Sequence, residues 1–268
     1  MIPYHFHSAR FGIDYNLSPN TLVGILANGN INAFKPSGQN KSNVENGAQE
    51  VVSAFATTNE SSDLWPSYSL NANLKHTFPK KKQELTVDLD VARYWNETEQ
   101  NFTTRYYDVN GEEYLPYYLL VGDLNGNLNI KSAKADYAYP INEAARFEAG
   151  VKTSLVSADN DLQFYDESDI NNPVFDSTIS NHFLYDELIN AAYVNFNYNW
   201  TKFSIQSGLR VEQTVADGTQ LINGVSFDRN YTNLFPSVFL NYSSVSYTHL
   251  RAHETVLDIV CRLMLEKK

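Results

Sequence analysis

The sequence predicts an all-β fold, a partial antiparallel up-and-down transmembrane β-barrel of about nine long strands. Three observations support this prediction: apolar and polar residues alternate over long stretches, these stretches exceed ordinary strand length, and the connections between them alternate between short and long. Strict alternation puts every second side chain on the same face of a strand, so it is typical of strands with one apolar and one polar face.

The alternation is clearest in residues 201–215, where apolar Leu209 is followed by Arg210. Val151 and Lys152 form a similar pair in an earlier strand. In a membrane barrel, side chains point alternately to lipid and to the interior. We therefore expect Val151 and Leu209 to face lipid, and Lys152 and Arg210 to face the barrel interior.

The alternating stretches cluster near a length of about 14 residues, whereas strands of soluble proteins average about 5–6 and a tilted membrane-crossing strand needs about 9–11. The predicted strands occupy residues 5–17, 21–35, 65–78, 83–97, 126–139, 145–158, 184–199, 202–217 and 227–243.

Short and long connections take turns along the chain, as in transmembrane barrels, where one end carries short turns and the other carries long loops. The short connections lie at 18–20, 79–82, 140–144 and 200–201, and the long ones at 36–64, 98–125, 159–183 and 218–226. Aromatic residues gather near strand ends, as expected for girdles at the two membrane interfaces. They are Tyr15, Phe78, Tyr137, Tyr139, Tyr198, Trp200 and Tyr242.

Composition excludes several classes of protein. The net charge of −11 and the pI near 4.9 argue against a nucleic-acid partner, which requires a basic face. The sequence has no run of 18 apolar residues that could form a membrane-spanning helix. A mean hydropathy of −0.40 is compatible with a barrel, because only alternate residues would face lipid. The single cysteine, Cys261, rules out a disulfide framework.

Few residues suggest chemistry. His5 and His7 lack a third metal ligand, and the segment 123–127 resembles a calcium loop only loosely. A pair such as Ser180 and His182 has no evident third member, and no nucleophile, phosphate-binding or zinc motif is present. We therefore predict no catalytic, cofactor-binding or metal-binding residues, no cofactor and no enzymatic activity. Cation binding by an acidic loop stays open as an alternative to a solvated loop; its members are Asp159, Asp161, Asp166, Glu167 and Asp169.

Two segments carry a family resemblance. The segment 227–242 contains Leu234-Phe235-Pro236-Ser237 after an aromatic-rich start, and 207–212 reads Ser-Gly-Leu-Arg-Val-Glu. Both resemble strands in the β-barrel domain of TonB-dependent outer-membrane receptors, as do units at 11–20 and 82–90, and the resemblance covers about residues 5–243.

The resemblance implies a 22-stranded barrel with a plugged lumen in the outer membrane of a Gram-negative bacterium. It also implies outer-membrane lipid, an extracellular solute and TonB as partners, the last through an N-terminal region of a longer parent protein, and leaves open a surface lipoprotein partner. The expected function is import of a solute. Two alternatives remain open: a non-transporting outer-membrane barrel that serves as adhesin or assembly platform, and a soluble all-β binding module.

The last part of the chain differs in pattern. The tyrosine- and asparagine-rich alternation stops at residue 245, and 245–255 and 259–268 resemble a translated sequencing adapter. We therefore expect two parts: a partial outer-membrane barrel at 1–243 and a non-native tail at 244–268. A short amphipathic helix at 255–268 is the alternative. Met1 runs almost directly into a strand pattern and is expected to be internal to a longer protein.

Overall fold

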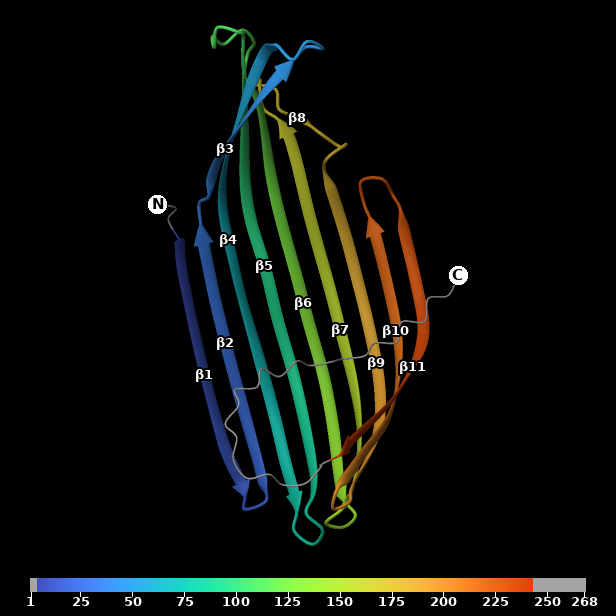
Figure 1. The fold of residues 1–268 in the computed structure, drawn as a ribbon. Helices are drawn as coiled ribbons and strands as arrows, with labels where there is room; N and C mark the ends of the chain where they lie inside the picture. Colours follow the sequence, from blue (N-terminus) through green and yellow to red (C-terminus); the bar gives the residue numbers. More distant parts are fainter. Residues whose placement is uncertain (1–3, 243–268) are drawn as a thin grey trace, which may run out of the picture.

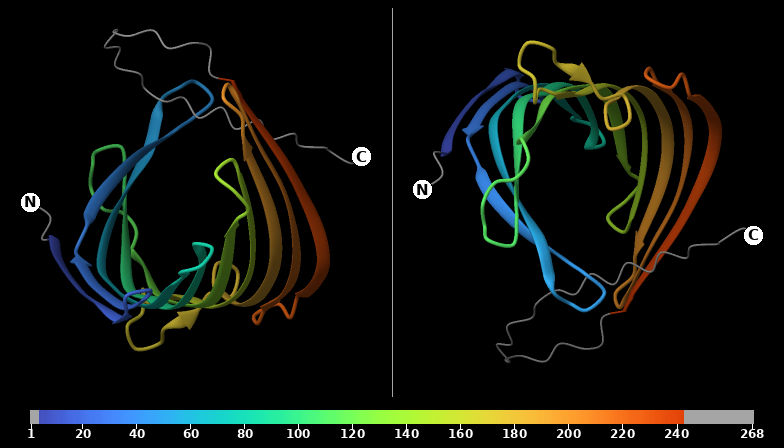
Figure 2. Two further views of the ribbon diagram at one scale, coloured as in Figure 1. Left: turned by 90° about the horizontal axis from the view of Figure 1, so that it is seen from below. Right: turned by 90° about the horizontal axis from the view of Figure 1, so that it is seen from above.

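The chain forms one curved antiparallel sheet of very long strands, which bends around an open interior (Figures 1 and 2). This computed structural model describes residues 4–242, so the predicted tail at 244–268 lies outside the described residues. The strands are β1 (Tyr4–Ser18), β2 (Thr21–Phe34), β3 (Ser37–Glu45), β4 (Val51–Phe78), β5 (Gln83–Tyr107), β6 (Tyr118–Pro140), β7 (Ala145–Asp166), β8 (Val174–Phe175), β9 (Asn181–Asn199), β10 (Phe203–Gln220) and β11 (Ser226–Tyr242).

The order of the strands confirms the predicted up-and-down fold. Neighbours run β1-β2-β4-β5-β6-β7-β9-β10-β11, and every pair along this path is antiparallel. These nine strands correspond to the nine predicted ones. The predicted total is too low, because β3 also pairs with β4 and the short β8 pairs with β7. Within the described residues, β1 and β11 form the two edges of an open sheet.

The short turns lie where the sequence predicts them, at one end of the sheet (Figure 1). They contain residues 19–20, 79–82, 141–144 and 200–202. In the third turn the Asn142 side-chain oxygen accepts hydrogen bonds from the backbone N–H groups of Ala144 and Ala145, both at 2.8 Å. Such asparagine turns replace the backbone hydrogen bonds that the strands no longer supply.

The predicted long loops are wrong in extent, because the strands continue through most of them. β4, β5, β6 and β7 each extend at least eight residues beyond the predicted strand. The connections left at this end are 46–50, 108–117, 167–173, 176–180 and 221–225. Alternation fails there because both faces of a strand beyond the membrane meet water, whereas the backbone hydrogen bonds between strands do not depend on side-chain polarity.

Two prolines mark interruptions in the sheet. Pro36 separates β2 from β3, and its carbonyl accepts a hydrogen bond from the Ser61 N–H at 3.0 Å, so the line of pairing with β4 continues past the break. Pro66 lies inside β4, where the pairing with β5 is interrupted at Trp65 and Pro66. A proline has no N–H to donate to the neighbouring strand, which explains the gap.

A single curved sheet cannot bury a conventional core. Among the described residues the only buried hydrophobic side chains are alanines, while large apolar residues such as Val151 and Leu209 are 57% and 47% exposed. An apolar face of this extent needs a nonaqueous surrounding. The described residues contain no helix that is long and apolar enough to cross a membrane.

Candidate functional site: the two faces of the barrel wall

The register of the sheet divides its side chains into two chemically different faces. The row of residues that pairs across the sheet through Val151 is apolar from one edge to the other: Tyr15, Val23, Leu74, Val87, Ala135, Val151, Ala192, Val211 and Leu234. The adjacent row, through Lys152, is mostly polar: Asp14, Gly24, Asn73, Asp88, Lys134, Lys152, Ala191, Glu212 and Asn233. Neighbouring rows point to opposite faces of a sheet.

The polar face is the concave one. A Cβ added to Gly208, on the polar face, would lie 2.8 Å from the Ser237 hydroxyl, and one added to Gly24 would lie 2.8 Å from the Asn73 side chain. A Cβ on Gly29, in a row on the apolar face, would meet nothing within 4 Å. Side chains converge on the inner side of a curved sheet and diverge on the outer side, so the polar face surrounds the interior and the apolar face points outward.

The outer face carries aromatic residues toward the end with the short turns. By register, six of the seven aromatic residues predicted for the girdles lie on this face, and the seventh, Trp200, lies in the turn after β9. Tyr198 and Trp200 lie with ring centroids 4.3 Å apart, and Phe203 and Tyr242 with centroids 4.7 Å apart. Tyr68 and Trp95 lie on the same face nearer the other end, with centroids 6.2 Å apart. This distribution matches two aromatic belts around an apolar band.

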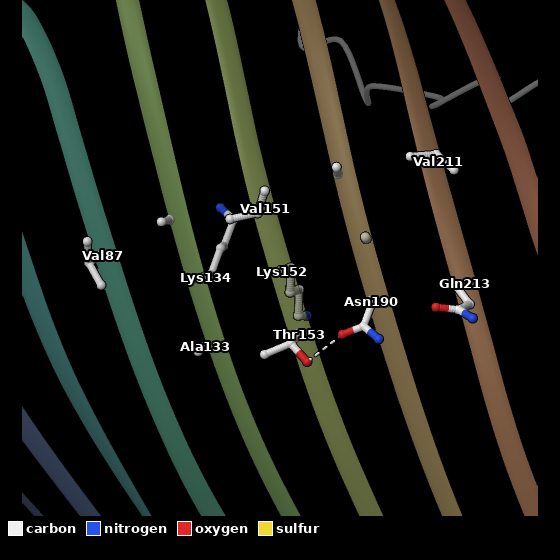
Figure 3. A pocket seen from close by; sticks show the side chains of 12 residues that line it. Val87, Ala133, Lys134, Val151, Lys152, Thr153, Asn190, Val211 and Gln213 are labelled. Carbon is white, nitrogen blue, oxygen red and sulfur yellow. Dashed lines mark hydrogen bonds between the residues drawn. The ribbon is translucent and has the colours of Figure 1, made fainter.

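A groove of about 510 Å³ crosses the outer face where small residues interrupt the larger ones (Figure 3). Val87, Val151 and Val211 border it, and alanines from β6 and β9 lie between them. The band is not wholly apolar at this level, since the Thr153 hydroxyl donates a 2.8 Å hydrogen bond to the Asn190 side-chain oxygen. That bond pairs the two polar groups with each other on a face where no water would be available.

The inner face carries a network of ion pairs and hydrogen bonds. The Lys134 ammonium lies 2.5 Å from an Asp136 carboxylate oxygen, and the Arg210 guanidinium donates to Glu212 at 2.9 Å. The Tyr193 hydroxyl donates a further bond to Asp136. Paired charges of both signs line this part of the wall, so it presents a hydrated surface to the interior.

Nearer the loop end, the inner face changes character. A pocket of about 590 Å³ is lined there by five asparagines and by the aromatic rings of β1, β4 and β5. We call it the asparagine pocket; its main inward-facing residues are Asn30, Asn32, Asn96, Asn160, Trp65, Tyr94 and Phe6. No charged residue lines it within the described part of the chain. The sequence alone does not reveal this site, because these seven residues come from five different strands and only the register brings them together.

Local contacts hold parts of the pocket in place. The Trp65 Nε1–H donates to the Thr98 hydroxyl at 3.4 Å, and Thr98 in turn donates to Asp63 at 2.8 Å. The Asn96 amide donates to the Leu124 carbonyl at 3.2 Å. Gly126 makes this possible, since a Cβ at that position would collide with the Asn96 amide.

The acidic residues predicted as one loop lie in two different settings. Asp159, Asp161 and Asp166 belong to β7, whereas Glu167 and Asp169 lie in the connection at 167–173. The His182 imidazole lies between two of them, with Nε2 2.8 Å from Asp159 and Nδ1 3.6 Å from Asp161. Among the described residues, no group of three or more histidine, cysteine or acidic side chains could hold a metal ion.

The remaining candidates also occupy structural positions. The Ser180 hydroxyl accepts a hydrogen bond from the Phe164 N–H at 2.9 Å, and no hydrogen bond joins it to His182 in the described residues. His5 and His7 are exposed on edge strand β1, and segment 123–127 is part of β6 rather than a loop.

Three carboxyl groups near the loop end have lowered pKa values. Hydrogen bonds from Ser168 lower the pKa of Asp166, and hydrogen bonds from Thr178 lower the pKa of Asp176. The backbone N–H of Glu112 has the largest effect on Asp108, whose pKa it also lowers. These carboxylates act as acceptors that order the chain at the loop end, which is a structural role.

A second aromatic group lies on the inner face near the loop end. The Tyr185 hydroxyl donates a 2.7 Å hydrogen bond to Glu187, and this bond, with burial, raises the pKa of Tyr185 to about 12. Phe183 and Phe227 stack around it with centroid separations of 6.4 Å.

An apolar outer band, aromatic belts and a polar interior define the wall of a transmembrane β-barrel. The comparison with known families identifies the kind of barrel: residues 76–252 match the model of the Outer membrane protein beta-barrel family, and the chain belongs to that family. This membership confirms the predicted fold class and the predicted location in the outer membrane of a Gram-negative bacterium.

Two solved structures are similar to the chain. The ferric citrate transporter FecA in its unliganded form shares 13% identity, with a TM-score of 0.43, over 91% of this chain and 40% of that chain. The ferric yersiniabactin uptake receptor FyuA from Yersinia pestis shares 11% identity, with a TM-score of 0.34, over 87% of this chain and 43% of that chain. The chain thus spans less than half the length of either protein. A search of curated proteins found no match.

Proposed function

We propose that this chain is part of the barrel wall of a TonB-dependent receptor, which imports an extracellular solute across the outer membrane. The main support is the inner face, which presents hydrogen-bonding groups along its whole length and a solute-sized pocket near the loop end. In barrels of this kind the short turns face the periplasm and the longer loops face the outside. The asparagine pocket then lies on the extracellular side of the membrane band.

The segments that resemble receptor strands support the same proposal. Leu234-Phe235-Pro236-Ser237 of β11 and Gly208-Leu209-Arg210 of β10 are direct neighbours in the sheet. Gly208 pairs with Ser237 and Leu209 pairs with Pro236, so the two motifs form one structural unit. The glycine leaves room for its neighbours there, because a Cβ would overlap the Asn195 side-chain oxygen and lie 2.8 Å from the Ser237 hydroxyl unless those side chains moved.

Energy-coupled import is the property that distinguishes this proposal from an adhesin or assembly platform. Cells that carry the full-length parent protein are compared with cells that lack it and with cells that lack TonB, using labelled oligosaccharides, ferric chelates and peptides. We expect one class of solute to accumulate only when both the parent protein and TonB are present. Accumulation that does not depend on TonB, or binding without accumulation, would contradict the proposal.

A further inference from the structure

We propose that the asparagine pocket binds a neutral, polyhydroxylated ligand such as an oligosaccharide. This inference rests on the proposed function and deepens it by naming a class of solute. The pocket volume of about 590 Å³ lies within the range of about 300–1,000 Å³ that is usual for ligand sites. The chemistry of its lining decides which ligand class fits.

The part of the pocket lining that the structure describes carries no charged side chain. The sequence contains 20 lysines and arginines and 31 acidic residues, and among residues 4–242 none of them lines the pocket. Recognition of carboxylates, phosphates or anionic metal chelates relies on arginine, lysine or a cluster of backbone N–H groups. Its lining therefore favours a ligand without net charge.

The asparagines offer the hydrogen bonds that hydroxyl groups need. Each amide has one acceptor oxygen and two donor hydrogens, and each hydroxyl of a sugar both donates and accepts. Asn30 and Asn160 make no side-chain hydrogen bond within the part of the chain that the structure describes, so their full capacity faces the pocket. The Asn96 amide is held by Leu124 and offers its oxygen at a fixed place.

The aromatic rings offer apolar surfaces beside these amides. Trp65 and Tyr94 are 47% and 46% exposed, although both point to the inner face. Phe34 packs edge-on against Trp65, at 5.0 Å and 79°, and holds its ring upright. An aromatic face carries negative charge density that attracts C–H groups. A sugar ring presents C–H groups on its faces and hydroxyls at its rim, which matches this arrangement of rings and amides.

Two variants test the pocket in the full-length protein. Tyr94→Leu removes a ring and Asn160→Leu removes an amide, and Tyr68→Leu is the matched control, since Tyr68 is an aromatic residue of similar height on the outer face. Assembly of each variant is checked by its heat-dependent mobility on gels. Isothermal titration calorimetry with neutral α-glucan, β-glucan and mannan hexasaccharides then measures affinity.

We expect at least one hexasaccharide to bind, and each pocket variant to weaken it about tenfold, while the control changes it less than about twofold. No hexasaccharide binding, or equal binding by wild type and both pocket variants, would overturn the inference. Binding of an anionic ferric chelate that the pocket variants weaken would overturn it as well, while leaving the proposed import intact. Conversely, pocket-dependent sugar binding without TonB-dependent accumulation would remove the proposed function and leave the binding site.

Discussion

An arginine scan along β10 tests whether the apolar face contacts lipid. Outward-facing positions run from Phe203 to Val215, which are 12 residue steps apart. At about 3.3 Å per residue and a tilt of about 40°, this span covers roughly 30 Å along the membrane normal, which is close to the thickness of the hydrocarbon core. Leu209 lies at its centre and Val215 at its loop-side edge.

Leu209→Arg should therefore cost about 2–4 kcal/mol of folding free energy in the full-length protein, whereas Val215→Arg should cost about 0–1 kcal/mol. Arg210→Ala, one residue away on the inner face, is the control. It removes an ion pair with Glu212 whose side chains are 37% and 25% exposed, so about 0–1 kcal/mol is expected.

Reversible unfolding of the full-length barrel in urea, from phospholipid vesicles, measures these differences. The ordering expected is a large loss for Leu209→Arg and small losses for Val215→Arg and Arg210→Ala. Equal losses on both faces, or no dependence on position along β10, would refute the assignment of the apolar face to lipid.

Three further predictions concern the ends of the wall and the tail. Protease added to intact cells should cut the parent protein within 46–50, 108–117 or 167–180, detected by mass spectrometry; cuts confined to the short turns would reverse the orientation. Tyr185→Phe should remove a phenol that titrates near pH 12 in ultraviolet absorbance. The pKa of Tyr185 in the folded protein lies above its ordinary value of 10.0. Tyr185 therefore contributes to the free energy of unfolding below pH 10, and this contribution is lost as the pH rises toward 12. A free energy of unfolding of the wild type that stays flat between pH 10 and 12 would contradict this prediction. We also propose that 244–268 derives from adapter sequence, and genomic reads that continue unbroken from codon 242 into codon 261 would contradict that proposal.

The cation alternative for the acidic residues of β7 is weakened by where they lie. Asp159 and Asp161 lie 2.8 Å and 3.6 Å from the imidazole of His182 on the neighbouring strand β9, so both carboxylates already have a polar neighbour there. The linear sequence could not show this, because His182 follows 21 residues after Asp161 and reaches it only through the register of β7 with β9.

The sequence by itself determined the class of fold and the assignment of the two faces. Alternation such as Leu209-Arg210 and Val151-Lys152 is a local property that any sheet preserves, so it correctly predicted which side chains share the apolar face and which share the polar face. The short turns were equally predictable, since three of the four contain proline or asparagine residues, which act within a few positions of the chain.

Only the tertiary structure decided how far the strands extend and which residues share a site. Strands such as β4 and β7 continue past the apolar band because their backbones stay hydrogen-bonded to neighbouring strands. Both faces of these extensions meet water, so their sequences need not alternate between apolar and polar residues, and the alternation pattern does not predict them. The asparagine pocket has the same origin. Asn30, Tyr94 and Asn160 are distant in the chain and chemically ordinary, and they form one surface only because pairing across five strands fixes their register.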